Sequence, residues 1–277
     1  MVKKIPMAIC YDFDGTLSPG NMQEYEFMDK LGAKAMWFWK KSLKFSKTQN
    51  ADPILAYMRL MLEEAQYKGL PVTRDYFNKC GENVEFFPGV TDWFKRINNY
   101  GKKNGVEVSH YIISSGLKEM IEGTAIAKEF KCIFASSFMY NASNVAYWPA
   151  NAVNYTGKTQ YLFRINKGCC DINDNKIINQ YIPEEDRAVP YKNMIYIGDG
   201  DTDIPCMKLV KLSGGHSIAV YNPRKKGRKN KAQKLIQEDR VNISANADYR
   251  EGKLLDSYVK SIIDKLSNDY KVMKFEK

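Results

Sequence analysis

Short runs of apolar residues recur along the chain, and several of them are separated by stretches whose apolar positions follow helical spacing. Each run has the length of a buried strand, and strands that alternate with helices are typical of a mostly parallel sheet covered by helices. The pattern therefore predicts an α/β fold, with strands near residues 5–11, 107–113, 131–135, 194–197 and 217–221.

Residues 20–87 show a different pattern, with helical periodicity and few strand signals. The segment ends at Pro88-Gly89, which breaks the preceding structure. Apolar residues after it return at helical spacing, which predicts a new helix from Val90 onward. The sequence therefore predicts a helical unit, residues 20–87, inserted into a core made of residues 1–19 and 88–277.

The later part of the chain has weaker signals. Between Gly116 and Lys158 we expect a helix from about 117 to 129, then a strand and a short hairpin near 136–156. Residues 246–251 are polar and predict a connector. Apolar positions from Leu254 to Leu266 predict a C-terminal helix.

Length and composition limit the choice of protein class. The 277 residues suffice for a large core plus a smaller unit. No apolar stretch is long enough to span a bilayer, and the first residues do not form a signal peptide, so we expect a cytoplasmic protein without membrane contact. Six cysteines without C-x-x-C spacing, and two histidines, predict unpaired thiols in a reducing compartment rather than a zinc site.

The net charge of +10 is concentrated in residues 224–234, which contain seven Lys or Arg residues. Such a run could contact the phosphates of a nucleic acid. No aromatic interleaving or known nucleic-acid module accompanies it, so a solvated loop leading into a helix is the favoured interpretation. A nucleic-acid partner is therefore not expected.

Two clusters of aspartates follow strand-like runs. Asp12 and Asp14 come directly after the first run and are separated by one residue, so both can reach one site at the end of that strand. Gly198-Asp199-Gly200-Asp201-Thr202-Asp203 follows the run ending at Ile197. Strands that deliver carboxylates at their carboxyl ends build a site at the switch point of an open α/β sheet. Oxygen ligands suit Mg²⁺.

These segments are similar to the motifs of the haloacid dehalogenase-like superfamily of Mg²⁺-dependent phosphohydrolases, and in detail to its phosphoserine-phosphatase-like branch. The resemblance spans roughly residues 5–225, and four motifs occur in the family's order. They are Asp12-Phe13-Asp14-Gly15-Thr16, Ser114, Lys158 and Gly198-Asp199-Gly200-Asp201-Thr202-Asp203. The resemblance implies a Rossmann-like core with an inserted helical cap of the C1 type, residues 20–87.

The resemblance also implies roles for the motif residues. Asp12 would be the nucleophile that forms an aspartyl-phosphate, and Asp14 the general acid and base. Mg²⁺ would be held by Asp12, by the main-chain carbonyl of Asp14 and by Asp199. Ser114, Ser115 and Lys158 would bind phosphoryl oxygens. Asp203 would hold metal-bound water or orient Lys158, whereas Asp201 is interpreted as a solvated turn residue.

An aspartate at position 14 favours a phosphatase or a phosphomutase over a dehalogenase, within this resemblance. We therefore expect a phosphomonoesterase acting on a small phosphorylated metabolite. A phosphomutase or phosphotransferase using the same site is the alternative, and a nucleic-acid-binding protein that uses residues 224–234 is a third. In the cap, Glu24, Tyr25 and Arg59 are candidate substrate contacts.

Overall fold

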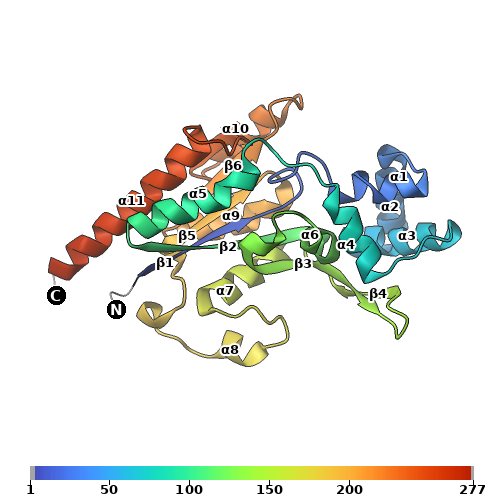
Figure 1. Cartoon of the computed structure of the whole chain (residues 1–277), viewed down its shortest axis with the longest axis horizontal. Helices are drawn as coiled ribbons and strands as arrows, with labels where there is room; N and C mark the ends of the chain where they lie inside the picture. Colours follow the sequence, from blue (N-terminus) through green and yellow to red (C-terminus); the bar gives the residue numbers. More distant parts are fainter. Residues whose placement is uncertain (1–3, 276–277) are drawn as a thin grey trace.

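The computed structural model describes residues 4–275 and contains a seven-stranded sheet in the order β4-β3-β2-β1-β5-β6-β7 (Figure 1). Every neighbouring pair is parallel except β3 and β4. This confirms the α/β fold expected from the sequence. The strands are β1 (Ile5–Tyr11), β2 (Val106–Leu117), β3 (Phe130–Tyr140), β4 (Ala146–Asn151), β5 (Met194–Gly198), β6 (His216–Tyr221) and β7 (Ile243–Asn246).

Helices cover the sheet and extend beyond it. In Figure 1 the four helices that follow β1 lie at one end of the molecule, and the two chain ends lie at the other. The helices are α1 (Phe27–Leu31), α2 (Ala35–Gln49), α3 (Pro53–Tyr67), α4 (Arg74–Glu82), α5 (Val90–Lys103), α6 (Lys118–Glu122), α7 (Thr159–Lys167), α8 (Asn175–Asn179), α9 (Ile204–Leu212), α10 (Arg228–Gln237) and α11 (Leu254–Phe275). No described helix combines the length and apolarity needed to cross a bilayer.

Strand β1 has an apolar face on each side of the sheet, as expected for a central strand whose side chains alternate. Ile5, Met7 and Ile9 belong to the apolar cluster that contains buried residues of α5 and α11. Ala8 and Cys10 belong to the second cluster, with buried residues of α7, α9 and α10. The core is therefore a sheet between two helical layers.

The position of β1 in the sheet places a crevice at its carboxyl end. From β1 the chain builds β2 and β3 on one side, and later returns to build β5, β6 and β7 on the other. At such a switch point the connections leave the sheet in opposite directions and open a crevice beyond the strand ends. Asp12 follows β1 and Asp199 follows β5, so both lie at this crevice.

Helices α1 to α4 form the segment expected to be a cap. Two of them begin at capping residues: the Asp52 side chain accepts from the Ile54 and Leu55 amides, and the Thr73 hydroxyl accepts from the Tyr76 amide. The β3–β4 hairpin contacts this segment, because the Ala146 amide donates to the Val72 carbonyl at 2.8 Å. The boundaries 1–19, 20–87 and 88–277 stay a prediction.

Two secondary-structure expectations were wrong. The helix expected over 117–129 is only α6 followed by a short 3₁₀ turn, Ala127–Glu129. It ends at Gly123, which packs directly against the Asn78 carbonyl of α4, where a side chain would overlap. Strand β7 was not expected, since Ile243–Asn246 is too short for a clear alternation.

The cysteines also differ from expectation at one pair. Cys132 of β3 and Cys170, after α7, form a disulfide with their Cα atoms 5.7 Å apart. Their pairing depends on how β3 and the loop after α7 meet in space, which sequence spacing does not reveal. Cys10, Cys80, Cys169 and Cys206 are buried free thiols, as expected.

Candidate active site

The first strand delivers two carboxylates to a cleft of about 440 Å³. The Asp12 amide donates to the Ile197 carbonyl at 2.9 Å, which continues the β1–β5 pairing by one residue and fixes Asp12 beside β5. The Asp14 Oδ1 accepts from the Met22 amide at 2.9 Å. Both carboxylates line the cleft, as their spacing of two residues predicts.

A tight turn follows these aspartates. The amides of Leu17 and Ser18 both donate to the Phe13 carbonyl, at 2.9 and 3.2 Å. Gly15 within this turn has φ +81°, a conformation that glycine adopts without strain. A Cβ at this position would overlap the Asp199 carboxylate. The glycine at position 15 therefore lets the turn after Asp12 approach the loop that carries Asp199.

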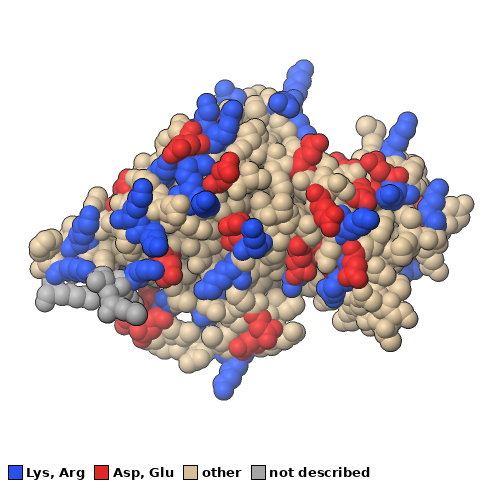
Figure 2. Space-filling model, viewed as in Figure 1, with Lys and Arg blue, Asp and Glu red and all other residues tan. Residues whose placement is uncertain are grey.

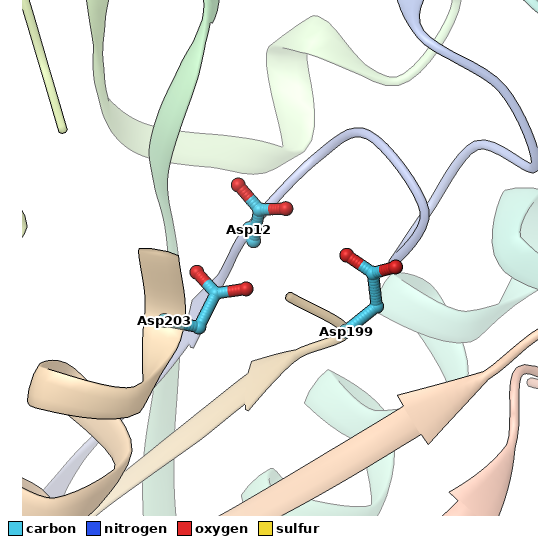
Figure 3. A group of neighbouring side chains, drawn as sticks. All are labelled: Asp12, Asp199 and Asp203. Carbon is cyan, nitrogen blue, oxygen red and sulfur yellow. The ribbon is translucent and has the colours of Figure 1, made fainter. Parts of the chain in front are cut away.

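Three carboxylates meet at the end of the sheet, as Figure 3 shows. Oxygen atoms of Asp12, Asp199 and Asp203 all lie within 4.8 Å of one another. The Asp203 Oδ1 accepts from Tyr196 at 2.8 Å, and its Oδ2 accepts from the Gly200 amide at 3.0 Å. Asp199 lies 3.4 Å from an Arg228 nitrogen. A cluster of oxygen donors at this spacing fits Mg²⁺ better than a softer metal.

Lys158 lies between two of these carboxylates. Its Nζ donates to Asp12 Oδ1 at 2.8 Å and to Asp203 Oδ1 at 2.7 Å, and the side chain is 0% exposed. Burial lowers the pKa of Lys158, but the charges of Asp12 and Asp203 outweigh it and raise the pKa above its ordinary value. The lysine is therefore a fixed positive charge beside Asp12.

Burial in the site disfavours the ionised form of these carboxylates. Burial raises the pKa of Asp12 to about 7, with a further increase from the charge of Asp203 and opposition from Lys158. Burial raises the pKa of Asp199 to about 6, again with the charge of Asp203 adding to the effect. Burial, and then the charge of Asp12, raises the pKa of Asp14 well above its usual range. These crowded acids gain stability from a bound cation.

The end of β2 supplies two hydroxyl groups. The Ser114 Oγ accepts from the Gly116 amide at 3.0 Å, which leaves the hydroxyl proton free to donate. The Ser115 Oγ is buried and has no hydrogen-bond partner among the described residues. Both serines line the cleft. A buried polar atom without a partner in such a place is available to a ligand.

Of the three candidate substrate contacts in the cap, only Glu24 lines the cleft. Glu24 lines the cleft, where its Oε1 accepts from Trp39 Nε1 and Asn21 Nδ2, both at 2.6 Å. The Tyr25 hydroxyl contacts Ser18 Oγ and the Gly20 amide, so this side chain supports the loop after β1 and is not among the lining residues. Arg59 forms a half-exposed ion pair with Glu63 on α3 and also lies away from the cleft.

Sequence reasoning missed several residues that line the cleft. In the helical segment, Gln23 is buried and its Oε1 has no described partner. Neither its place in the sequence nor its type signals this. Aromatic and aliphatic side chains and three cations of the basic run also line the cleft. These further lining residues are Trp39, Ile54, Tyr57, Tyr155, Asn222, Lys225, Arg228 and Lys231.

Comparison with known proteins gives the family. Residues 9–208 match the family described as haloacid dehalogenase-like hydrolase, which covers most of the chain. The chain belongs to this family and is thus an enzyme of the hydrolase class. A protein of Borreliella burgdorferi, described only as uncharacterized, is 30% identical over 282 residues, covering 91% of this chain and 95% of that protein.

Two similar solved structures are those of phosphoserine phosphatases. A substrate-bound phosphoserine phosphatase complex has a TM-score of 0.57 at 16% identity, covering 94% of this chain and 99% of that chain. A phospho-aspartyl intermediate analogue of phosphoserine phosphatase has a TM-score of 0.54 at 15% identity, covering 93% and 99%. At these identities the likeness concerns the fold.

Proposed function

We propose that this protein is a Mg²⁺-dependent phosphatase that hydrolyses a small phosphorylated metabolite through an aspartyl-phosphate on Asp12. The observation that carries the proposal is the position of Lys158 between Asp12 and Asp203, within a cluster of three carboxylates. Phosphoryl transfer needs a nucleophile beside fixed positive charge, and this arrangement supplies it. The cleft volume suits a small molecule.

The metal would be held by the carboxylates of Asp12 and Asp199 and by the main-chain carbonyl of Asp14. Bound Mg²⁺ would screen the repulsion between the Asp12 carboxylate and the phosphate anion. The donor set supports this assignment, because the carboxylate oxygens of Asp12 and Asp199 lie within 4.8 Å of one another. The glycine at position 15 keeps that space open beside Asp199.

In the first step an Asp12 oxygen would attack phosphorus while the bond from phosphorus to the leaving oxygen breaks. Lys158 contacts Asp12 Oδ1 and would hold the carboxylate ionised in the required orientation. The leaving oxygen takes a proton from Asp14, whose raised pKa favours the protonated form that can donate it. The product alcohol then leaves the cleft.

In the second step Asp14, now ionised, would take a proton from water. The water oxygen attacks phosphorus, and the bond from phosphorus to Asp12 breaks to release inorganic phosphate. The Met22 amide donates to Asp14 Oδ1 and fixes the orientation of this side chain in both steps. One residue can act as acid and then as base because each step returns the proton that the other uses.

The phosphoryl oxygens would be bound by Ser114, Ser115 and Lys158. The free hydroxyl protons of the two serines and the remaining proton of Lys158 are donors that the protein itself leaves unused. Donors that are fixed before the reaction stabilise charge on the phosphoryl group without reorganisation.

The proposal is tested by phosphate release from sugar phosphates, nucleoside monophosphates, phosphoamino acids and an aryl phosphate. Activity should require Mg²⁺, vanish with a chelator and be absent in Asp12→Asn. Isomerised product in place of free phosphate would instead identify a phosphomutase. Absence of phosphate release from every substrate by a folded protein would contradict the proposal.

The nucleic-acid alternative is not favoured. On the face shown in Figure 2, acidic side chains are interspersed with the Lys and Arg side chains, so that face offers no continuous basic track. Within residues 224–234, three of the seven cations line the cleft. Salt-dependent binding of RNA or DNA that depends on the other four would support the alternative.

A further inference from the structure

The basic run of residues 224–234 lies beside the candidate active site because of the strand order. Strand β6 pairs in parallel with β5, with Ala219 opposite Gly198. The carboxyl ends of the two strands therefore meet at the same edge of the sheet. The chain leaves β6 at Tyr221, and α10 begins at Arg228, so the run begins where β5 delivers Asp199.

The seven cations of this run divide into two groups. Lys225, Arg228 and Lys231 line the cleft, and we call them the rim cations. Arg228 and Lys231 are three residues apart on α10 and therefore share a face of that helix. The other four do not line the cleft and are largely exposed: Arg224, Lys226, Lys229 and Lys234. The same short segment thus provides the site and a matched control.

Each rim cation keeps donors that its present contact does not use. The Lys225 Nζ donates to the Pro19 carbonyl at 2.9 Å, and it forms no ion pair within residues 4–275. Arg228 approaches Asp199 through one nitrogen at 3.4 Å, which leaves most of its guanidinium free. Lys231 pairs with Asp201, whose side chain is 63% exposed. Pairs this exposed contribute little and rearrange at small cost.

The rim cations lie within reach of a small molecule bound at the nucleophile. Arg228 contacts Asp199, and Asp199 oxygens lie within 4.8 Å of those of Asp12. One carboxylate thus separates Arg228 from the carboxylate that would attack phosphorus. Lys158, Ser114 and Ser115 already provide donors for a single phosphoryl group, so the rim cations are additional positive charge in the same cleft.

From this placement we infer that the substrate carries a second anionic group beside the phosphate that is hydrolysed, and that Lys225, Arg228 and Lys231 bind it. The inference rests on the proposed phosphatase function and narrows its substrate class to phosphate monoesters that carry a second anionic group. The second group is a carboxylate or another phosphate, since both accept several hydrogen bonds from Lys and Arg. A monoester with only neutral groups lacks this contact.

The test uses a matched pair of phosphonates that the enzyme cannot hydrolyse. 3-Phosphonopropionate carries a carboxylate where propylphosphonate carries an uncharged carbon, and propane-1,3-bisphosphonate carries a second phosphonate. Dissociation constants are measured by calorimetry with Mg²⁺ present. We expect the wild type to bind at least one of the two compounds that carry a second anionic group roughly tenfold or more tightly than propylphosphonate. Which of the two binds better identifies the second group.

Three variants assign this preference to the rim. Lys225→Ala/Arg228→Gln/Lys231→Ala should reduce it to less than about threefold. Arg224→Ala/Lys226→Ala/Lys229→Ala removes the same charge from the same segment and should retain it. Lys225→Ala alone should also reduce the preference, and this residue contacts no acidic side chain in the described chain, so its effect cannot come through Asp199.

Equal binding of all three compounds by the wild type would overturn the inference, as would equal loss in both triple variants. Because binding of these compounds needs no turnover, the result is independent of the phosphate-release assay. A rim-dependent preference without hydrolysis would contradict the proposed phosphatase but retain the anion site. Hydrolysis without a rim-dependent preference would retain the phosphatase and remove the narrower substrate class.

Discussion

The backbone of Gly15 lies so close to the Asp199 carboxylate that no side chain fits between them. Gly15 also has φ +81°, which disfavours any other residue. Two motifs from distant parts of the chain can therefore approach this closely only because glycine has no Cβ atom. The carboxylate that Gly15 contacts is one of the three that meet at the end of the sheet, within 4.8 Å of Asp12.

Gly15→Ala should reduce phosphatase activity by about 10²-fold or more, because the new Cβ would displace the Asp199 carboxylate and small displacements of catalytic groups are costly. The strained backbone should also lower the free energy of unfolding by about 1–3 kcal/mol. Phosphate release at saturating Mg²⁺ and urea unfolding measure the two effects.

The control is Gly105→Ala. Gly105 also has positive φ, at +74°, but nothing lies within 4 Å of the position a Cβ would take. It should show a similar cost in unfolding free energy with activity retained. Equal loss of activity in both variants would mean that backbone strain, not the contact with Asp199, explains the result.

Lys158→Met should lower the free energy of unfolding by about 3–5 kcal/mol near neutral pH, because it leaves the buried carboxylates of Asp12 and Asp203 without their shared partner. The measurement is urea unfolding. Lys231→Met is the matched control, since its partner Asp201 is largely exposed, and should cost less than about 1 kcal/mol. Similar values for the two variants would contradict the structural role given to Lys158.

The core of the site could be predicted because its residues directly follow apolar strands. Asp12 and Asp199 come after β1 and β5. Because the carboxyl ends of parallel strands lie at the same edge of a sheet, these two residues are expected to lie close together. That Gly15 contacts Asp199 could not be predicted, since it depends on the exact approach of two loops. The same applies to Tyr196, whose hydroxyl reaches Asp203 from within β5.

The cap contacts could not be predicted for a different physical reason. Helical periodicity shows which face of a helix is apolar, but not which polar positions face a neighbouring unit. Arg59 and Tyr57 lie two residues apart on α3, and only Tyr57 lines the cleft. The rim cations were visible as a charged run, but their role depends on β6 lying next to β5.

Mg²⁺ should stabilise the wild-type protein against heat, whether or not a substrate is known. At a concentration about 100-fold above its dissociation constant, the gain is about 2.7 kcal/mol of unfolding free energy. Asp199→Asn should lose this gain, because it removes a charged oxygen from the carboxylate cluster. Differential scanning calorimetry with and without Mg²⁺ measures the shift.

Asp201→Asn is the comparison for this experiment, since Asp201 lies two residues further along but outside the carboxylate cluster. It should keep most of the Mg²⁺-dependent shift. Loss of the shift in Asp201→Asn with retention in Asp199→Asn would exchange the roles assigned to the two residues.

His110 should make the stability of the protein depend on pH below neutrality. The Trp93 Nε1 donates to the Tyr11 hydroxyl at 2.7 Å, the hydroxyl lies 2.9 Å from His110 Nδ1, and His110 Nε2 lies 3.0 Å from Asn98 Oδ1. Because the indole only donates, the Tyr11 proton is directed at Nδ1, which favours the neutral ring with its proton on Nε2.

Burial lowers the pKa of His110 to about 3, whereas an unfolded histidine titrates near 6.5. The unfolded chain therefore binds a proton first as pH falls, so the contribution of His110 is complete above about 6.5 and is lost toward 3. Between pH 7 and pH 5 the loss of unfolding free energy is about 2 kcal/mol.

His110→Gln keeps a donor and an acceptor without the titration, so its unfolding free energy should fall less over this range. Other titrating groups are common to both proteins and cancel in the difference, which urea unfolding at each pH provides. Parallel pH profiles for the two proteins would show that the native protein accommodates the charged ring, and would contradict the buried neutral state.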